Sequence, residues 1–226
     1  MSNATPQPLA VEVDPQTTVS ALWQRPADAG AACTLAHGAG AGMTHAFMAA
    51  AAQGLAQRGI ASLRYQFAFM ERGSKRPDAP ALAHAVVRAA VAKARPLAGE
   101  LPMYAGGKSF GGRMTSQAQA AQALTDVRGL FFIGFPLHPA GKPSDARAAH
   151  LADVALPMLF LQGTRDELAE LALLRPVVDR LGERAQLEII EHADHAFHVP
   201  ARSGRSDAQT LADLLDRLAG WMLRSS

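Results

Sequence analysis

Cysteine is almost absent from this sequence, because Cys33 is the single thiol among its 226 residues. One cysteine excludes a disulfide bond within the chain. Cys33 lies in the apolar run 31–36, which is typical of a buried strand. A cysteine in such a run behaves as a small core residue, so we do not interpret Cys33 as a nucleophile.

Long apolar runs are also absent, and no segment approaches the ~20 apolar residues of a membrane-spanning helix. Residues 1–13 lack the basic start and apolar centre of a secretory signal. The net charge is +2, and the lysines and arginines are scattered rather than gathered in a basic stripe with aromatic residues. We therefore expect a cytoplasmic protein with neither a membrane nor a nucleic acid as its partner.

Hydrophobic residues are plentiful, at 49% of the chain against 19% for charged residues. This balance supplies enough apolar side chains for a large core and argues against disorder. A length of 226 residues suits one α/β domain. We predict a flexible N-terminus over residues 1–8 and a single domain over residues 9–226.

Short apolar runs alternate with longer helical stretches along the chain. Strands are predicted at 9–13, 18–23, 31–36, 60–65, 101–106, 128–135, 156–161 and 185–191. The first two are expected to form an antiparallel hairpin. Helices are predicted at 47–58, 79–94, 110–124, 168–181 and 207–223. This alternation predicts a mostly parallel sheet with helical crossovers, and therefore a three-layer α/β/α sandwich.

The strongest chemical signal is GKSFG at residues 107–111, which matches G-x-S-x-G around Ser109. A predicted strand precedes it and a predicted helix follows it, as in a nucleophile elbow. The glycines permit a sharp turn that raises the serine hydroxyl above the sheet. A rival interpretation takes GGKS as the end of a nucleotide-binding P-loop, but that motif requires a glycine where this chain has Pro102. We therefore predict Ser109 as the nucleophile.

A second signal is HGAG at residues 37–40, directly after the strand predicted at 31–36. In hydrolases with a nucleophile elbow, such a loop supplies one of two backbone amides that bind the oxyanion, and the residue after the nucleophile supplies the other. The candidate donors are Ala39, with Gly40 as the alternative, and Phe110. We expect the ring of His37 to tie this loop to the backbone.

Two later loops carry the candidate partners of Ser109. Asp166 lies in GTRD after the strand predicted at 156–161, and His195 lies in EHADHAFH after the next one. A carboxylate on a loop at the end of one strand can reach an imidazole on the neighbouring loop. The chain order Ser109, Asp166, His195 matches the triad order of α/β-hydrolases. We predict His195 as the general base and Asp166 as the residue that orients it.

The spacing of His192, His195 and His198 also allows a metal site. That stretch contains no helix-favouring run, and acidic partners at the spacing of a zinc site are missing. We therefore expect no metal. His192 lies too close to its strand to reach Ser109, and His198 lies where the chain is leaving the site, so His195 is preferred as the base.

Four motifs together, HGAGAG, GKSFGG, GTRDE and ADHAF, resemble the dienelactone-hydrolase-like branch of the α/β-hydrolases over about residues 31–224. The chain looks closest to a small subgroup with few lid insertions. The resemblance implies the α/β-hydrolase fold, a serine triad and hydrolysis of an ester or related acyl compound. Dienelactone hydrolases carry a cysteine nucleophile where this chain has Ser109, so their substrate is not carried over.

These observations predict a serine hydrolase that acts on a small-molecule carboxylic ester through an acyl-enzyme intermediate, without a cofactor. The alternative is a non-catalytic α/β-hydrolase fold that serves as an interaction module, because a fold alone does not prove a function. The intact triad order and loop glycines favour the enzyme.

The predicted pocket is open, because segment 134–153 leaves little chain for a lid and must also supply a helix near 145–151. Small-molecule sites combine apolar walls with a few polar groups. The candidate wall residues are Met43, Phe67, Leu137, His138 and Phe197. A small open pocket favours short esters with about two to four acyl carbons.

Three charged residues end or follow the strand predicted at 60–65, namely Arg64, Glu71 and Arg72. One of the two arginines could meet a carboxylate on the substrate. A surface salt bridge is the simpler interpretation for each residue taken singly.

Overall fold

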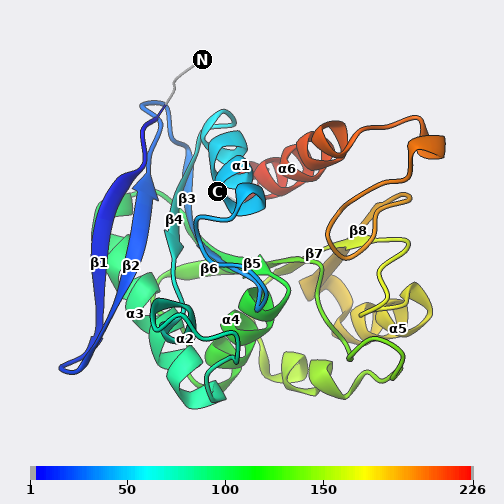
Figure 1. Cartoon of the computed structure of the whole chain (residues 1–226), viewed down its shortest axis with the longest axis horizontal. Coiled ribbons are helices and arrows are strands. Elements are labelled where there is room, and N and C mark those ends of the chain that lie inside the picture. The colour runs from blue at the N-terminus through cyan, green and yellow to red at the C-terminus, as the bar shows by residue number, and fades with distance from the viewer. Residues whose placement is uncertain (1–3, 225–226) are drawn as a thin grey trace.

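A computed structural model of the chain describes residues 4–224 and has three layers (Figure 1). Its central sheet has eight strands in the order β1-β2-β4-β3-β5-β6-β7-β8. The β1-β2 and β2-β4 pairs are antiparallel, and every other neighbouring pair is parallel. The strands are β1 (Gln7–Asp14), β2 (Thr17–Gln24), β3 (Ala31–Ala36), β4 (Ile60–Tyr65), β5 (Met103–Lys108), β6 (Val127–Ile133), β7 (Met158–Gly163) and β8 (Ala185–Ile190).

Helices cover both faces of the sheet, as Figure 1 shows. One face is packed against α1 (Ala46–Ala56) and α6 (Asp207–Arg224). The other face carries α2 (Ala68–Glu71), α3 (Pro80–Ala98), α4 (Phe110–Ala121) and α5 (Leu171–Leu181). Three short 3₁₀ helices, η1 (Ala146–Asp153), η2 (Gly182–Arg184) and η3 (Ala201–Ser203), lie in the connections. The predicted three-layer α/β/α sandwich is confirmed.

The inner strands are rich in apolar residues because helices cover both faces of the sheet. Every residue of β3, β4 and β7 is buried. A parallel strand with helices on both faces reads as a continuous apolar run, because both of its sides face the core. The edge strand β1 instead alternates between exposed and more buried positions. The sheet thus brings the ends of β3, β5, β7 and β8 to one edge with little freedom of register.

Several predicted boundaries differ from those of the structure, and two of them have a clear physical reason. The predicted flexible segment 1–8 begins in residues outside the described part of the chain, but Gln7 and Pro8 belong to β1, where they pair with Trp23 and Leu22. The helix predicted to end at residue 94 continues past Pro96. A proline close to a helix end removes a single backbone hydrogen bond, and the buried Ala98 still packs into the core.

The connection between β6 and β7 forms no lid over the sheet. Its 3₁₀ helix η1 packs against α4 and α5. Ala148 and Leu151 of that helix are buried in the same core cluster as those two helices. The segment is therefore part of the body of the domain, and the predicted minimal lid is confirmed.

Candidate active site

Ser109 lies in the turn between β5 and α4 with φ 49° and ψ −115°. A non-glycine residue at positive φ stores strain on the order of 1–3 kcal/mol, which the surrounding fold must offset. Glycines on both sides make the turn possible. A Cβ on Gly107 would lie 2.3 Å from the carbonyl oxygen of Ala36, and one on Gly111 would lie 2.5 Å from that of His37. Both glycines therefore let the serine turn pack directly against the end of β3.

The structure brings Ser109, His195 and Asp166 together. Nε2 of His195 lies 2.8 Å from the Ser109 hydroxyl oxygen, and its Nδ1 lies 2.7 Å from Oδ2 of Asp166. A proton on Nδ1 is donated to the carboxylate, which leaves Nε2 free to accept the hydroxyl proton. The Asp166 side chain is fully buried, whereas that of His195 is 25% exposed and open to a small molecule.

Asp166 is held by two further donors besides His195. The side-chain amide of Gln162 donates to Oδ2 at 2.5 Å, and the backbone amide of Leu168 donates to Oδ1 at 2.8 Å. Gln162 is itself buried and accepts a hydrogen bond from the backbone amide of Phe135. A buried carboxylate needs such donors to remain charged. Gln162 was not predicted from the sequence, although a polar residue at the end of an apolar strand is a usable signal.

His37 fixes the loop that follows β3. Its Nε2 accepts the backbone N–H of Phe67 at 3.0 Å, so the proton sits on Nδ1, which donates to the carbonyl of Gly38 at 2.7 Å. Burial lowers the pKa of His37 and outweighs the bond to Gly38, which raises it. The neutral ring therefore ties the loop to the backbone after β4, as the sequence predicts.

A cavity of about 380 Å³ opens in front of Ser109. Its wall is made largely of small or apolar residues from the loop after β3, the start of α1 and the loops after β7 and β8. The lining residues are Gly38, Ala39, Gly40, Ala41, His45, Phe47, Lys108, Ser109, Leu168, His195 and Ala196. Such a wall suits a compact apolar molecule with a polar reacting centre.

The predicted pocket walls need correction. None of the five residues predicted as walls is among the described residues that line this cavity. Phe67 is fully buried, with ring contacts to His37 and Phe110. Leu137 is fully buried in the core beneath the sheet. The ring of His138 is also buried, and its Nε2 lies 2.7 Å from a carboxylate oxygen of Glu170. These side chains turn inward, away from the cavity.

Met43 and Phe197 lie beside the lining residues rather than among them. The carbonyl of Met43 accepts a hydrogen bond from Arg64, and its amide donates to Gln66. Phe197 has positive φ and stacks on Phe47, with 6.3 Å between ring centroids. Phe197 therefore packs behind Phe47, and Phe47 is the aromatic residue that lines the cavity.

Neither predicted arginine lies in the cavity. Arg64 is 3% exposed and is held by the carbonyl of Met43 at 3.2 Å. Arg72 pairs with Asp78 at 2.5 Å, and Glu71 accepts hydrogen bonds from Ser20. The cationic side chain that does line the cavity is Lys108, which was not predicted because it occupies a variable position of the G-x-S-x-G motif.

The three clustered histidines make different contacts. The His192 backbone amide donates to Thr164, the His198 ring lies 2.8 Å from Asp207, and His195 faces Ser109. Within residues 4–224, no group of three or more His, Cys, Asp or Glu side chains is placed to hold a metal ion.

None of the described helices is long and apolar enough to cross a membrane.

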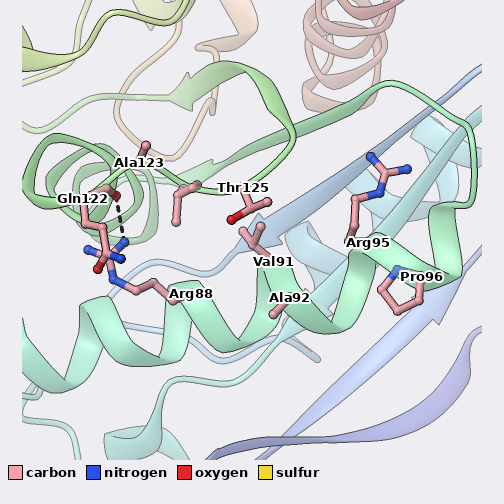
Figure 2. A pocket seen from close by; sticks show the side chains of 9 residues that line it. Arg88, Val91, Ala92, Arg95, Pro96, Gln122, Ala123 and Thr125 are labelled. Carbon is pink, nitrogen blue, oxygen red and sulfur yellow. Dashed lines mark hydrogen bonds between the residues drawn. The ribbon is translucent and has the colours of Figure 1, made fainter.

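A second cavity, of about 390 Å³, lies between α3 and the loop after α4 (Figure 2). Two arginines line it, and both use their guanidinium groups on backbone carbonyls. Arg88 donates to the carbonyls of Ala118 and Gln122, both at 2.8 Å, and Arg95 donates to that of Leu101 at 2.9 Å. The nine residues that line this cavity include no histidine and no carboxylate.

Comparisons with known proteins agree with this architecture. A family model described as an alpha/beta hydrolase domain matches residues 29–223. A dienelactone hydrolase from Anabaena variabilis superimposes with a TM-score of 0.78 at 20% identity, covering 98% of both chains. An α/β serine hydrolase homologue from Coxiella burnetii gives 0.72 at 17% identity, covering 99% of this chain and 97% of that chain.

A serine hydrolase without a lid, from Xanthomonas campestris, gives a TM-score of 0.70 at 20% identity and covers 94% of both chains. At these identities the structural likeness shows the fold. The predicted α/β-hydrolase fold and the resemblance to dienelactone-hydrolase-like proteins are confirmed by these matches together.

Proposed function

Because the chain belongs to the alpha/beta-hydrolase domain family, we propose that it is a serine hydrolase of small carboxylic esters or related acyl compounds. Ser109 is the nucleophile, His195 the general base and Asp166 the residue that orients the base. The observation that carries this proposal is the continuous hydrogen-bonded chain from the Ser109 hydroxyl through the imidazole to the carboxylate, at 2.8 and 2.7 Å.

In the first half of the reaction, the Ser109 oxygen attacks the substrate carbonyl carbon while Nε2 of His195 takes the hydroxyl proton. The imidazolium returns this proton to the leaving alcohol as the ester bond breaks. Asp166 holds the Nδ1 tautomer and stabilises the imidazolium charge. The buried donors from Gln162 and Leu168 keep the carboxylate in place for this task.

In the second half, water replaces the alcohol. His195 takes a proton from the water as its oxygen attacks the acyl carbon, and then returns the proton to Ser109 as the acid leaves. No cofactor takes part in this scheme. The exposed quarter of the His195 side chain supports it, because leaving alcohol and incoming water both need access to Nε2.

The oxyanion is assigned to two backbone amides. Phe110 is the first residue of α4, and the first amides of a helix have no carbonyl partner within that helix. Ala39 and Gly40 both line the cavity opposite this turn, and Ala39 is the preferred second donor. Donors of this kind stabilise the tetrahedral intermediate by about 3–4 kcal/mol each in comparable enzymes.

A fluorophosphonate probe tests this assignment against that of an interaction module. The probe carries an electrophilic phosphorus that reacts with activated serine hydroxyls. We expect mass spectrometry to find one adduct, on the peptide that contains Ser109, and none in Ser109→Ala. Folded wild-type protein that stays unlabelled would favour the non-catalytic alternative. An adduct on another serine would assign the role of nucleophile to that serine instead of Ser109.

A further inference from the structure

Lys108 directly precedes Ser109 at the end of β5 and lines the same cavity. Its Nζ donates a hydrogen bond to the backbone carbonyl of His195. One side chain therefore joins the strand that carries the proposed nucleophile to the loop that carries the proposed base. The donor of this hydrogen bond is the residue next to Ser109, and the acceptor is the backbone of His195 itself.

Two aromatic rings hold the same ammonium group. Nζ of Lys108 lies 5.3 Å from the ring centroid of Phe47 in α1 and 4.9 Å from that of Phe197 in the loop after β8. The two rings stack on each other at an interplanar angle of 26°. A cation within about 6 Å of a ring is attracted to its face, so the ammonium is held by two separate segments of the chain, α1 and the loop after β8.

The loop after β8 has its own internal support, centred on Asp194. The Asp194 side chain accepts the backbone amides of Ala196 and His198, while Phe197 takes positive φ between them. These bonds shape the loop but do not attach it to β5. The attachment is made by Lys108 and by the bond from His195 to Ser109.

We propose that Lys108 is a positioning residue, whose ammonium group ties the His195 loop to β5 and α1 and so keeps the imidazole within reach of Ser109. This inference rests on the proposed function, because it assigns Lys108 a role in that same reaction. Lys108 acts through the backbone of His195 and through the two rings, and it transfers no proton itself.

The charge of Lys108 is the part of this arrangement that pH can change. Burial lowers the pKa of Lys108 to about 8, and the nearby charges of Asp166 and Asp194 counteract part of that effect. The rings of His45 and His195 line the same cavity. As pH rises through this range, the amine becomes neutral and loses its attraction to the rings. Its bond to the carbonyl of His195 also weakens, because charge-assisted hydrogen bonds are the stronger kind.

The same lowered pKa sets an opposite expectation for stability. In the unfolded chain the lysine keeps its ordinary pKa of 10.5, so the folded state disfavours the charged form. The charged ammonium therefore lowers the free energy of unfolding at neutral pH. This loss of stability is relieved as pH rises from the folded pKa of about 8 toward the unfolded pKa of 10.5. Replacing Lys108 with methionine removes this buried charge, so the substitution is expected to retain or raise the Tm.

The experiment measures the rate of fluorophosphonate labelling at Ser109 from about pH 6 to 10, together with the Tm, in four proteins. These are wild type, Lys108→Met, Lys108→Arg and the surface control Lys75→Met. We expect wild type and the control to slow as pH rises through about 8. For Lys108→Met, we expect labelling to be about 10- to 100-fold slower at neutral pH, the size of effect expected when a reacting group is misplaced.

The labelling rate of Lys108→Met should show no further fall above pH 8, and this variant should keep its Tm. Lys108→Arg keeps a charge over the rings and should recover much of the rate without the fall.

Lys108→Met that labels at the wild-type rate, or that still slows above pH 8, would overturn the inference. A slow variant with a lowered Tm would also overturn it, because it would assign Lys108 to folding instead of positioning. Failure of the proposed function looks different, since wild-type Ser109 would then remain unlabelled at every pH, and the inference would fall with it.

Discussion

The two cavities of this protein have nearly the same volume, about 380 Å³ at Ser109 and about 390 Å³ between α3 and the loop after α4. Their polar groups differ in what they are free to do. At Ser109, a hydroxyl, an imidazole and a carboxylate form one hydrogen-bonded chain. In the other cavity, Arg88 donates to the backbone carbonyl of Gln122 (Figure 2), and Arg95 donates to that of Leu101. The size of a cavity therefore says little about function, whereas the pairing of its polar groups says much.

Backbone strain also bears on this comparison. Ser109, His192 and Phe197 all have positive φ, and all three belong to the turn or the loop that frame the first cavity. No described residue that lines the second cavity has positive φ, but Asp126, which directly follows its lining residue Thr125, does. Strained residues persist where the surrounding packing determines them, and they cluster at functional sites. The positive φ of Ser109, within the lining itself, supports the first cavity as the reactive one.

The largest expected effect separates the cavities directly. Ser109→Ala should lower ester turnover by roughly 10⁴- to 10⁶-fold, because the nucleophile of a triad has no substitute. Thr125→Ala is the matched control, since it removes one hydroxyl from the lining of the second cavity. Steady-state hydrolysis of p-nitrophenyl acetate measures both variants. Retention of more than a few per cent of activity in Ser109→Ala would remove Ser109 from its role.

The next test asks which histidine belongs to the first cavity. His195→Ala should lose roughly 10⁴-fold or more in kcat, because Nε2 of His195 is the atom that faces the Ser109 hydroxyl. His192→Ala and His198→Ala are the matched controls and should keep most of the activity. An inactive His198→Ala beside an active His195→Ala would contradict the assignment.

Chelation completes this test for the histidine cluster. We expect prolonged treatment with EDTA to leave ester turnover unchanged, because within residues 4–224 no group of three or more His, Cys, Asp or Glu side chains is placed to hold a metal ion. Loss of turnover on chelation, restored by added Zn²⁺, would revive the metal site that the histidine spacing allows.

Chain length of the substrate tests the shape of the first cavity. p-Nitrophenyl esters with about two to four acyl carbons should be preferred about tenfold or more in kcat/KM over long-chain esters, because little apolar surface is available to cover a long chain. The small side chains of Ala39, Ala41 and Ala196 in the lining support this limit. A maximum at eight carbons or beyond, in a kcat/KM series, would contradict the small open pocket.

The smallest expected effect lies in the second cavity. Arg88→Ala removes two hydrogen bonds to carbonyls at the end of α4 and should lower the free energy of unfolding by about 1 kcal/mol. Ester turnover should be unchanged, because this cavity shares none of its described lining residues with the cavity at Ser109. Urea unfolding monitored by circular dichroism, beside the activity assay, gives both numbers. A loss of turnover without a loss of stability would show that the two cavities are coupled.

The sequence predicted the architecture closely, because each of its strong signals is local. All eight predicted strands are present, and the buried ones were visible as apolar runs between turns and helices. The candidate residues Ser109, Asp166 and His195 were found from their positions at strand ends, and the structure brings them within hydrogen-bond distance. Their catalytic roles stay predictions until the substitutions are measured.

The pocket walls could not be predicted in the same way. Position after a strand indicates that a residue is near the sheet edge, but it does not indicate which way the side chain turns. Phe67 turns inward onto His37, and Phe197 stacks behind Phe47. These orientations depend on segments that are far apart in the chain, so no local pattern contains them.

The sequence by itself determined the alternation of elements, the sharp glycine turn around Ser109 and the order of the three candidate catalytic residues. Periodicity, backbone freedom and chain order are properties of short segments, so they survive without tertiary contacts. The tertiary structure alone decided that Gln162 supports Asp166 and that Lys108 reaches the carbonyl of His195 between two rings. Such contacts exist only after parallel strands bring their ends to one edge, because the packing there decides which buried polar groups find partners.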